Sequence, residues 1–348
     1  MNNLKRTLLI CLVLSNFYCS AFAQIANEIT VKGTGFEMNG KPFEYTGISF
    51  FNALYNTEFN KNHETRLKYI KSFKEHGINV LRIWCQWDNL SGYIDSGKGK
   101  TLYNDNGSLK PEQVSRLNEI ITDADSVGVV VLLVLFARES WDINIRLSDK
   151  STEKAVESIT NELLLHRNLI FQIWNEHNYR TADYFDMVKK CDPARLVTNS
   201  PGYGGDLGTD EENQKMDFLS PHTSRNDNIH LELAADEIKL LIQKYHKPVV
   251  DDEPGRRGTP LFGGPKLPTL PYDHIIQIYN VWKVGGYVIY HHDMFQTGYG
   301  SEAVPANGIP APGFSLYHDQ VFDFLKNKNN YLKLFRKEFA NAYGDKLK

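Results

Sequence analysis

Residues 129–136 read Val-Val-Val-Leu-Leu-Val-Leu-Phe, and this uninterrupted apolar run limits the possible folds more than any other feature of the chain. A strand with one face in water alternates apolar and polar residues, whereas a run without polar breaks is typical of a strand covered on both faces. The preceding segment, 111–127, has helical spacing and is opened by Pro111 and closed by Gly128. A helix followed by a doubly covered strand indicates a parallel α/β sheet.

The same pairing of a short apolar run with a helical segment recurs along the chain. The predicted strands are 45–51, 78–84, 129–136, 169–174, 196–199, 218–221, 248–251 and 286–291. The predicted helices are 62–76, 111–127, 152–165, 184–190, 231–245, 274–283 and 317–339. About eight strands in βα alternation fit a closed barrel better than an open doubly wound sheet. No GxGxxG follows the first strand, which weakens the dinucleotide-binding alternative. We therefore predict an α/β protein with a single (β/α)8 barrel, also called a TIM barrel.

A short hairpin precedes the first predicted strand of the barrel. Residues 36–43 carry Asn39-Gly40 between two extended segments, and this dipeptide is typical of a two-residue hairpin turn. We expect this N-terminal β-hairpin to plug the bottom of the barrel.

The first 23 residues have the pattern of a secretory signal peptide. Basic residues are followed by a mostly apolar run over 7–18, and Ala21-Phe22-Ala23 is a small-x-small cleavage signal. The apolar run falls short of the ~20 residues that a membrane span needs. Residues 1–23 are therefore predicted to be the signal peptide and 24–348 the barrel domain of a secreted or periplasmic protein, with no membrane span in the mature chain.

Lipidation at Cys19 is a minor alternative, since the residues before it lack the small side chains expected there. Of the remaining cysteines, Cys85 and Cys191 could form one bridge, but Cys85 lies in a strand-like run and is more typical of a buried thiol. A net charge of −3 and a pI near 6.4 argue against nucleic acid as the main partner. The oligomeric state stays open.

Two glutamates lie just past the ends of predicted strands. Glu176 ends the run Ile-Trp-Asn-Glu, and Glu253 follows strand 248–251. Polar residues at the carboxyl ends of parallel barrel strands form the usual site for chemistry. As the fourth and seventh strands in our count, the two should face one another across the mouth. Glu253 has acidic neighbours, and strand alternation predicts that Asp251 shares its side while Asp252 points the opposite way.

The chain resembles glycoside hydrolase family 5 and its relatives in the clan of retaining enzymes with (β/α)8 barrels. The likeness covers most of the mature chain and is carried by segments 36–43, 45–49, 79–84, 174–176 and 247–255. It implies a retaining β-glycoside hydrolase that acts on a poly- or oligosaccharide by double displacement and needs no cofactor.

The resemblance assigns roles to four of the matching residues. It implies that Glu176 is the acid/base, Glu253 the nucleophile, and Asn175 a ligand of the sugar 2-hydroxyl. Arg82 would keep Glu253 ionised, because a neighbouring cation favours the carboxylate. We expect Glu176 to lie in an apolar wall near Trp174, which would raise its pKa.

His222, at the end of the sixth predicted strand, matches the family pattern, but three other positions depart from it. Ser224 stands where a tyrosine is expected, and 136–138 read Phe-Ala-Arg where a histidine is often found. His291-His292 replaces the tryptophan that usually ends the eighth strand. We predict that His222, His291 and His292 contact sugar hydroxyls.

Aromatic and basic residues near the predicted mouth have two interpretations each. Trp84 could stack on a sugar face or pack in the core, and we include it among the substrate-binding residues. Arg138, Arg256 and Arg257 could pair with an acidic or sulfated sugar, but salt bridges among the loops are favoured.

Two other functions stay open. One is a carbohydrate-binding barrel without catalysis. The other is a metal-dependent barrel hydrolase, suggested by His291, His292 and Asp293 together with 251–253. The first strand lacks the His-x-His of such enzymes, so we expect no metal ligands.

Overall fold

The computed structural model describes residues 27–87, 100–143, 145–225, 230–254, 270–292, 295, 308–331 and 333. The predicted signal peptide, Arg256, Arg257 and Asp293 lie outside the described residues. None of the helices in the described ranges is both long and apolar enough to cross a membrane. Cys85 is buried, Cys191 is half-buried, and both are free thiols.

Seven parallel strands form a curved sheet in the order β8-β7-β6-β5-β4-β10-β9. The order follows the chain from β4 to β8, as expected for successive βα units. The strands are β4 (Thr46–Ser49), β5 (Val80–Trp84), β6 (Val130–Ala137), β7 (Leu169–Asn175), β8 (Leu196–Thr198), β9 (Val250–Asp251) and β10 (Tyr287–Tyr290).

Residues 217–220 close this sheet into a barrel. The Asp217 N–H donates to the Val197 carbonyl at 3.0 Å, and Leu219 exchanges hydrogen bonds with the segment at β9. The predicted strand 218–221 is thus reduced to a bridge at Leu219. Pro221 and Pro248 lie on either side of this pairing and have no N–H with which to extend the ladder. The predicted (β/α)8 barrel is confirmed.

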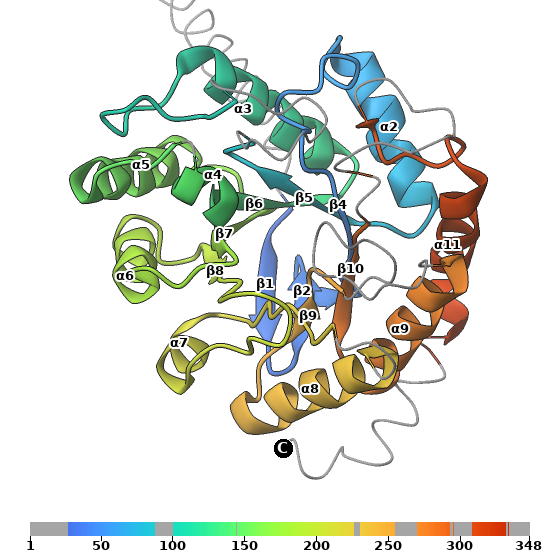
Figure 1. The fold of residues 1–348 in the computed structure, drawn as a ribbon. Coiled ribbons are helices and arrows are strands. Elements are labelled where there is room, and N and C mark those ends of the chain that lie inside the picture. The colour runs from blue at the N-terminus through green and yellow to red at the C-terminus, as the bar shows by residue number, and fades with distance from the viewer. Residues whose placement is uncertain are drawn as a thin grey trace, which may run out of the picture.

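Helices surround the barrel and cover the outer face of its strands (Figure 1), whereas buried side chains cover the inner face. The helices are α2 (His63–Glu75), α3 (Pro111–Ser126), α4 (Arg138–Ile143), α5 (Asp149–Glu162), α6 (Thr181–Cys191), α7 (Asp210–Lys215), α8 (His230–Tyr245), α9 (Pro271–Lys283) and α11 (Leu316–Lys326).

Several predicted helices have different bounds in the structure, since α5, α6 and α9 each begin three residues earlier than expected and α11 ends early. The helix expected at 152–165 starts earlier, because the Ser148 side chain caps the N-terminus of α5 by accepting the Ser151 N–H at 3.3 Å. The helix expected at 317–339 is interrupted, since α11 ends at Lys326 with Asn327 as its C-cap. Asparagine is a frequent helix-ending residue.

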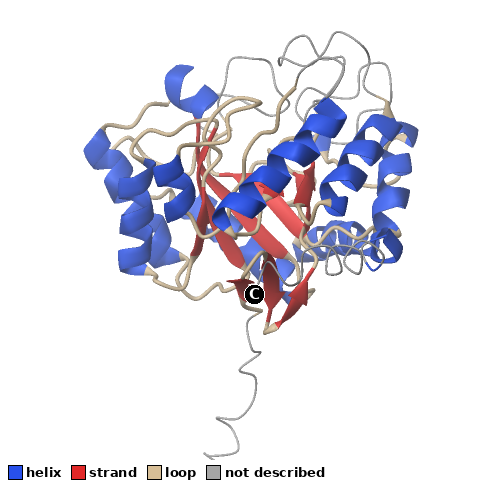
Figure 2. Ribbon diagram, turned by 90° about the horizontal axis from the view of Figure 1, so that it is seen from below, coloured by secondary structure: helices blue, strands red, loops and turns tan. Residues whose placement is uncertain are grey.

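A three-stranded antiparallel sheet lies at one end of the barrel (Figure 2). It consists of β1 (Ile29–Lys32), β2 (Gly35–Met38) and β3 (Lys41–Phe43). Asn39 and Gly40 both have positive φ, 52° and 73°, as the predicted hairpin turn requires. The ring of Phe36 lies 5.0 Å from that of Tyr45, which precedes β4, and 5.1 Å from that of Tyr287, which starts β10. The sheet therefore plugs the barrel at the amino ends of its strands, as predicted.

The barrel interior changes from apolar to polar along its axis. Near the plug it is filled by buried side chains such as Val80, Leu132 and Ile170. Farther along the same strands, Arg82 and Gln172 are buried and joined by a hydrogen bond. Buried polar groups are retained where they are mutually satisfied. The polar layer lies toward the carboxyl ends of the strands.

Candidate active site

Glu176 follows the last residue of β7 in a left-handed conformation, with φ of 59°. This conformation is uncommon for a residue with a Cβ and persists where neighbours fix it. The Asn199 side chain accepts the Trp174 N–H at 2.9 Å and donates to the His177 carbonyl at 2.9 Å. The Ser200 N–H also donates to the Trp174 carbonyl at 3.1 Å. The end of β8 therefore holds the backbone on both sides of Glu176.

Glu253 lies two residues after the two-residue strand β9 and is 5% exposed. Its neighbour Asp252 points into the barrel, where its Oδ2 accepts from Gln172 Nε2 at 2.8 Å and lies 3.2 Å from Arg82 Nη2. The prediction that Asp252 lies opposite Glu253, with Asp251 on the same side, is therefore wrong. Regular alternation ends with β9 at Asp251, and the chain bends at the next two residues.

Asp251 faces away from this cluster. Its carboxylate accepts hydrogen bonds from Thr223 Oγ1 at 3.1 Å and from Gln277 Nε2 of α9 at 3.0 Å. Burial raises the pKa of Asp251 to about 7, against the opposing effect of these two hydrogen bonds.

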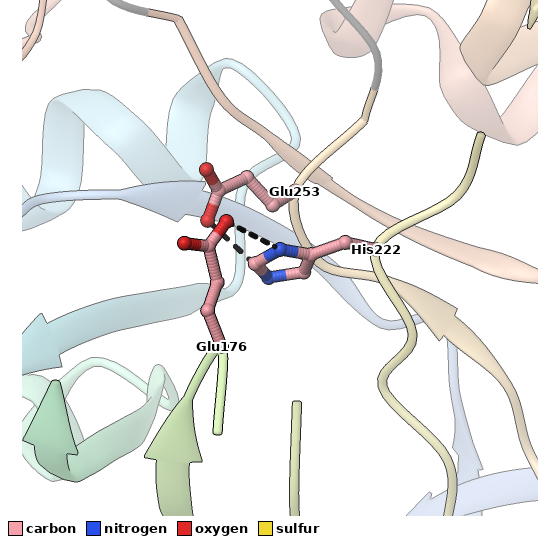
Figure 3. Close-up of side chains that lie close together, drawn as sticks. All are labelled: Glu176, His222 and Glu253. Carbon is pink, nitrogen blue, oxygen red and sulfur yellow. Dashed lines mark hydrogen bonds and ion pairs between the residues drawn. The ribbon is translucent and has the colours of Figure 1, made fainter. Parts of the chain in front are cut away.

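His222 connects the two glutamates (Figure 3). Its Nδ1 lies 3.1 Å from Glu176 Oε1, and its Nε2 lies 3.3 Å from Glu253 Oε2. One carboxylate oxygen of each glutamate and a ring nitrogen of His222 lie within 4.8 Å of one another. The structure thus brings together three residues that the sequence placed at the ends of three different strands.

Arg82 is fully buried and contacts residues on both sides of the barrel. Its Nη2 donates to Asn175 Oδ1 at 2.6 Å, its Nη1 donates to the Asp252 carbonyl at 3.1 Å, and Nη1 lies 3.6 Å from Glu253 Oε2. Arg82 therefore fixes the orientation of Asn175 beside the glutamates. The predicted pair of Arg82 with Glu253 is present, although it is the longest of these contacts.

His291, from the end of β10, contacts Glu253 more closely. Its Nε2 lies 3.2 Å from Glu253 Oε1, and its Nδ1 lies 2.9 Å from Ser49 Oγ. Burial alone would raise the pKa of Glu253, but His291, His222 and Arg225 together hold it well below its ordinary value. Glu253 is accordingly an ionised carboxylate.

Two arginines complete the surroundings of the glutamates. Arg138 Nη2 donates to Glu176 Oε2 at 3.0 Å, and Arg225 Nη2 donates to Glu253 Oε1 at 3.1 Å and lies 4.0 Å from Glu176 Oε1. The expectation of an apolar wall around Glu176 is therefore wrong. The Trp174 ring instead packs against Trp141 at 4.8 Å. Arg225 was not predicted from the sequence. Its position, three residues after the predicted site residue His222, was the only indication that it could reach the site.

The described contacts of Trp84 and His292 are with residues other than the two glutamates. The Trp84 ring is 1% exposed, stacks on Phe51 at 4.5 Å and lies 4.5 Å from the Arg82 guanidinium. The His292 ring lies 5.1 Å from those of Tyr317 and His318, which belong to α11. The structure shows both in packing contacts, and their contact with sugar stays a prediction.

Glu176, His222 and Glu253 are also the kinds of residue that ligate metals, and one atom of each is close enough to the others to share an ion. The surrounding charges oppose this, because Arg138 and Arg225 lie 3.0 and 3.1 Å from the same carboxylates. A divalent cation between these carboxylates would be repelled by both guanidinium groups. The residues present fit a metal poorly.

The family model described as cellulase (glycosyl hydrolase family 5) matches residues 36–226. No curated protein matches the sequence. Among solved structures, a proposed glycoside hydrolase from Bacteroides vulgatus ATCC 8482 is 19% identical, with a TM-score of 0.67 over 90% of this chain and 62% of that one. The chain thus spans less than two thirds of the length of that protein.

Two further structures share the fold. A glycoside hydrolase family 5 protein from Bacteroides vulgatus ATCC 8482 is 16% identical, with a TM-score of 0.66 over 87% of this chain and 72% of that one. An endo-1,4-beta-mannanase from Rhizomucor miehei is 13% identical, with a TM-score of 0.59 over 89% of this chain and 99% of that one. At these identities, the structural likeness shows the barrel fold.

Proposed function

The chain belongs to glycosyl hydrolase family 5, and we propose that it hydrolyses a β-linked poly- or oligosaccharide with retention of anomeric configuration. As a member of this family it is a glycosidase with a carbohydrate substrate. The observation that carries the finer proposal is the pair of carboxylates from β7 and β9. One oxygen of each carboxylate lies within 4.8 Å of the other, with His222 in contact with both. Retaining enzymes have carboxyl groups about 5–5.5 Å apart, whereas inverting enzymes separate them by roughly 6.5–9.5 Å.

In the proposed first step, an oxygen of Glu253 attacks the anomeric carbon while the glycosidic C–O bond breaks. Glu176 gives its proton to the departing oxygen, and the sugar becomes an ester of Glu253. The low pKa of Glu253 supports the nucleophile role, since the attacking group must be ionised.

In the second step, a water molecule takes the place of the departed sugar. Glu176 removes a proton from this water as its oxygen attacks the anomeric carbon, and the ester bond to Glu253 breaks. The buried contacts of Arg82 with Asn175 support a fixed position of the Asn175 amide beside the sugar.

The experiment that tests the proposal measures kcat/KM on a panel of β-linked glycans for the wild type, Glu176→Gln and Glu253→Gln. General acid–base catalysis contributes about 10²- to 10⁴-fold, so Glu176→Gln should lose at least ~100-fold. Glu253→Gln should also lose at least ~100-fold, because the amide cannot replace the carboxylate that forms the covalent intermediate. Glu157→Gln is a matched control because Glu157 is exposed on α5.

Wild-type rates in both site variants would contradict the assignment. A non-catalytic carbohydrate-binding barrel would instead bind glycans without turnover, and Glu176→Ala would leave the affinity unchanged.

We also propose that the protein is secreted or periplasmic, on the basis of residues 1–23 alone. Amino-terminal sequencing of the exported protein should begin at Gln24.

A further inference from the structure

The three positions at which the sequence departs from the family pattern are linked by one property. At or next to each of them, a basic side chain contacts one of the two glutamates. Arg138 reaches Glu176, whereas Arg225, beside Ser224, and His291 both reach Glu253. Basic side chains thus lie against both glutamates, and two of them are guanidinium groups, which pair well with anionic oxygens.

Counted over the described residues alone, the guanidinium groups of the cluster outnumber its ionised carboxylates by one when the general acid is protonated. Among the described residues the cluster holds three arginines, Arg82, Arg138 and Arg225, against the carboxylates of Asp252, Glu253 and Glu176. The general acid must be protonated before bond cleavage. Three guanidinium charges then face two carboxylate charges, and the histidines contribute no negative charge.

Arg138 also forms an ion pair with Glu176, the proposed acid/base, and binding of the substrate must break this pair. Its Nη2 lies 3.0 Å from Glu176 Oε2, and a guanidinium at this distance favours the ionised carboxylate over the protonated acid. An anion that competes for the guanidinium would release Glu176 to hold its proton.

The two arginines are placed to meet such an anion. Their side chains are 22% and 11% exposed for Arg138 and Arg225, whereas that of Arg82 is fully buried. Arg138 lies over the ring of Tyr203 at 4.1 Å, and Tyr203 is 60% exposed. The guanidinium is thus held against an exposed aromatic residue of a kind that can stack on a sugar.

We propose that the substrate carries an anionic group, a carboxylate or a sulfate ester, on a sugar next to the scissile bond, and that Arg138 and Arg225 bind it. This inference rests on the proposed hydrolase function. On binding, Arg138 exchanges Glu176 for the anion, so the substrate itself prepares the acid/base for proton transfer.

The test uses matched pairs of oligosaccharides. One pair is a uronate-containing oligosaccharide and the same compound with its carboxylates reduced to hydroxymethyl groups. The other is a sulfated oligosaccharide and its desulfated form. kcat/KM is measured for all four compounds, and their affinity for Glu253→Gln is measured by calorimetry. The pair that shows the difference identifies the anion.

We expect kcat/KM to be about 10- to 100-fold higher for the anionic member of one pair, the range for hydrogen bonds to charged groups. Arg138→Gln and Arg225→Gln should each reduce this ratio toward one, and Arg138→Lys should retain part of it. Arg116→Gln should leave the ratio unchanged, because Arg116 pairs with Glu112 on α3 instead of with the site glutamates.

Two outcomes separate this inference from the proposed function. If neutral members are hydrolysed as well as anionic ones, with loss in Glu176→Gln and Glu253→Gln, the hydrolase stands and the anion site is refuted. If anionic members bind more tightly but none is hydrolysed, the anion site stands and the hydrolase is refuted. Equal binding of both members, without hydrolysis, refutes both.

Discussion

At the scale of single residues, the site is defined by how the charges of Glu176 and Glu253 are compensated. Glu253, the proposed nucleophile, is contacted by His291, His222 and Arg225, which stabilise its ionised state. Under the proposed mechanism, Glu176 must exchange its partner Arg138 before it can act as an acid. The two carboxylates would then take different roles because their surroundings differ.

The same charges predict that activity does not depend on a metal. Dialysis against EDTA should leave kcat/KM unchanged, because the guanidinium groups beside both glutamates oppose a bound cation. A metal-dependent barrel hydrolase would lose its rate on chelation and regain it when a divalent cation is added. That result would count against the glycosidase mechanism proposed here.

The positions of Glu176 and Glu253 could be predicted because each lies just past a short apolar run. Their surroundings could not. Arg225 and Arg138 lie in or beside loops, where no periodicity shows which way a side chain points. The prediction for the sides of Asp251 and Asp252 is wrong because β9 is only two residues long. Side chains alternate between the two faces only within a strand, so the rule does not apply beyond its end.

At the scale of elements, the link between β7 and β8 positions Glu176, the proposed acid/base. Asn199 joins the two strand ends and lies beside the left-handed turn at Glu176. Asn199→Ala should lower kcat about 10- to 100-fold with little change in KM, because small displacements of a catalytic group are costly. Asn199→Asp keeps an oxygen for the Trp174 N–H and should be less impaired.

Asn168 provides a matched control for that experiment. It is a buried asparagine just before β7, at the other end of the strand, and its amide donates to the carbonyls of Ile121 and Val129 at 3.1 Å. Asn168→Ala should lower the melting temperature but leave kcat near the wild-type value. Equal loss of kcat in both variants would show a general loss of structure and not a positioning role for Asn199.

At the scale of the whole molecule, the barrel followed from βα alternation, because closing eight parallel units buries every apolar strand on both faces. The hairpin plug followed from one dipeptide, Asn39-Gly40. The number of regular strands was harder to predict, since the expected strand 218–221 contributes a single bridge. Proline placement controls the extent of that pairing, and a hydrophobic pattern does not show it.

The stability of the whole barrel should depend on pH through Asp251. Its pKa is about 7 in the folded state, against 3.8 as the ordinary value, because burial penalises the charged form. Between these values the unfolded chain has lost the proton and the folded chain still holds it. The folded state therefore binds more protons, and stability falls as pH rises through this window.

Asp251→Asn removes this titration while keeping a side chain of similar shape. Relative to the variant, the wild type should lose melting temperature from about pH 4 to about pH 7 and change little above that range. Circular dichroism melts at pH 4.5, 6 and 8 measure the difference. A difference that is constant, or that grows in favour of the wild type as pH rises, would refute the assigned pKa shift.

The stereochemistry of hydrolysis tests the central claim most directly, because it reports whether Glu253 forms a bond to the sugar. Proton NMR of a β-linked substrate during the first minutes of reaction identifies the anomer released, before mutarotation. Double displacement predicts the β-anomer as the first product. Release of the α-anomer would show a single displacement by water, and it would contradict the nucleophile role of Glu253.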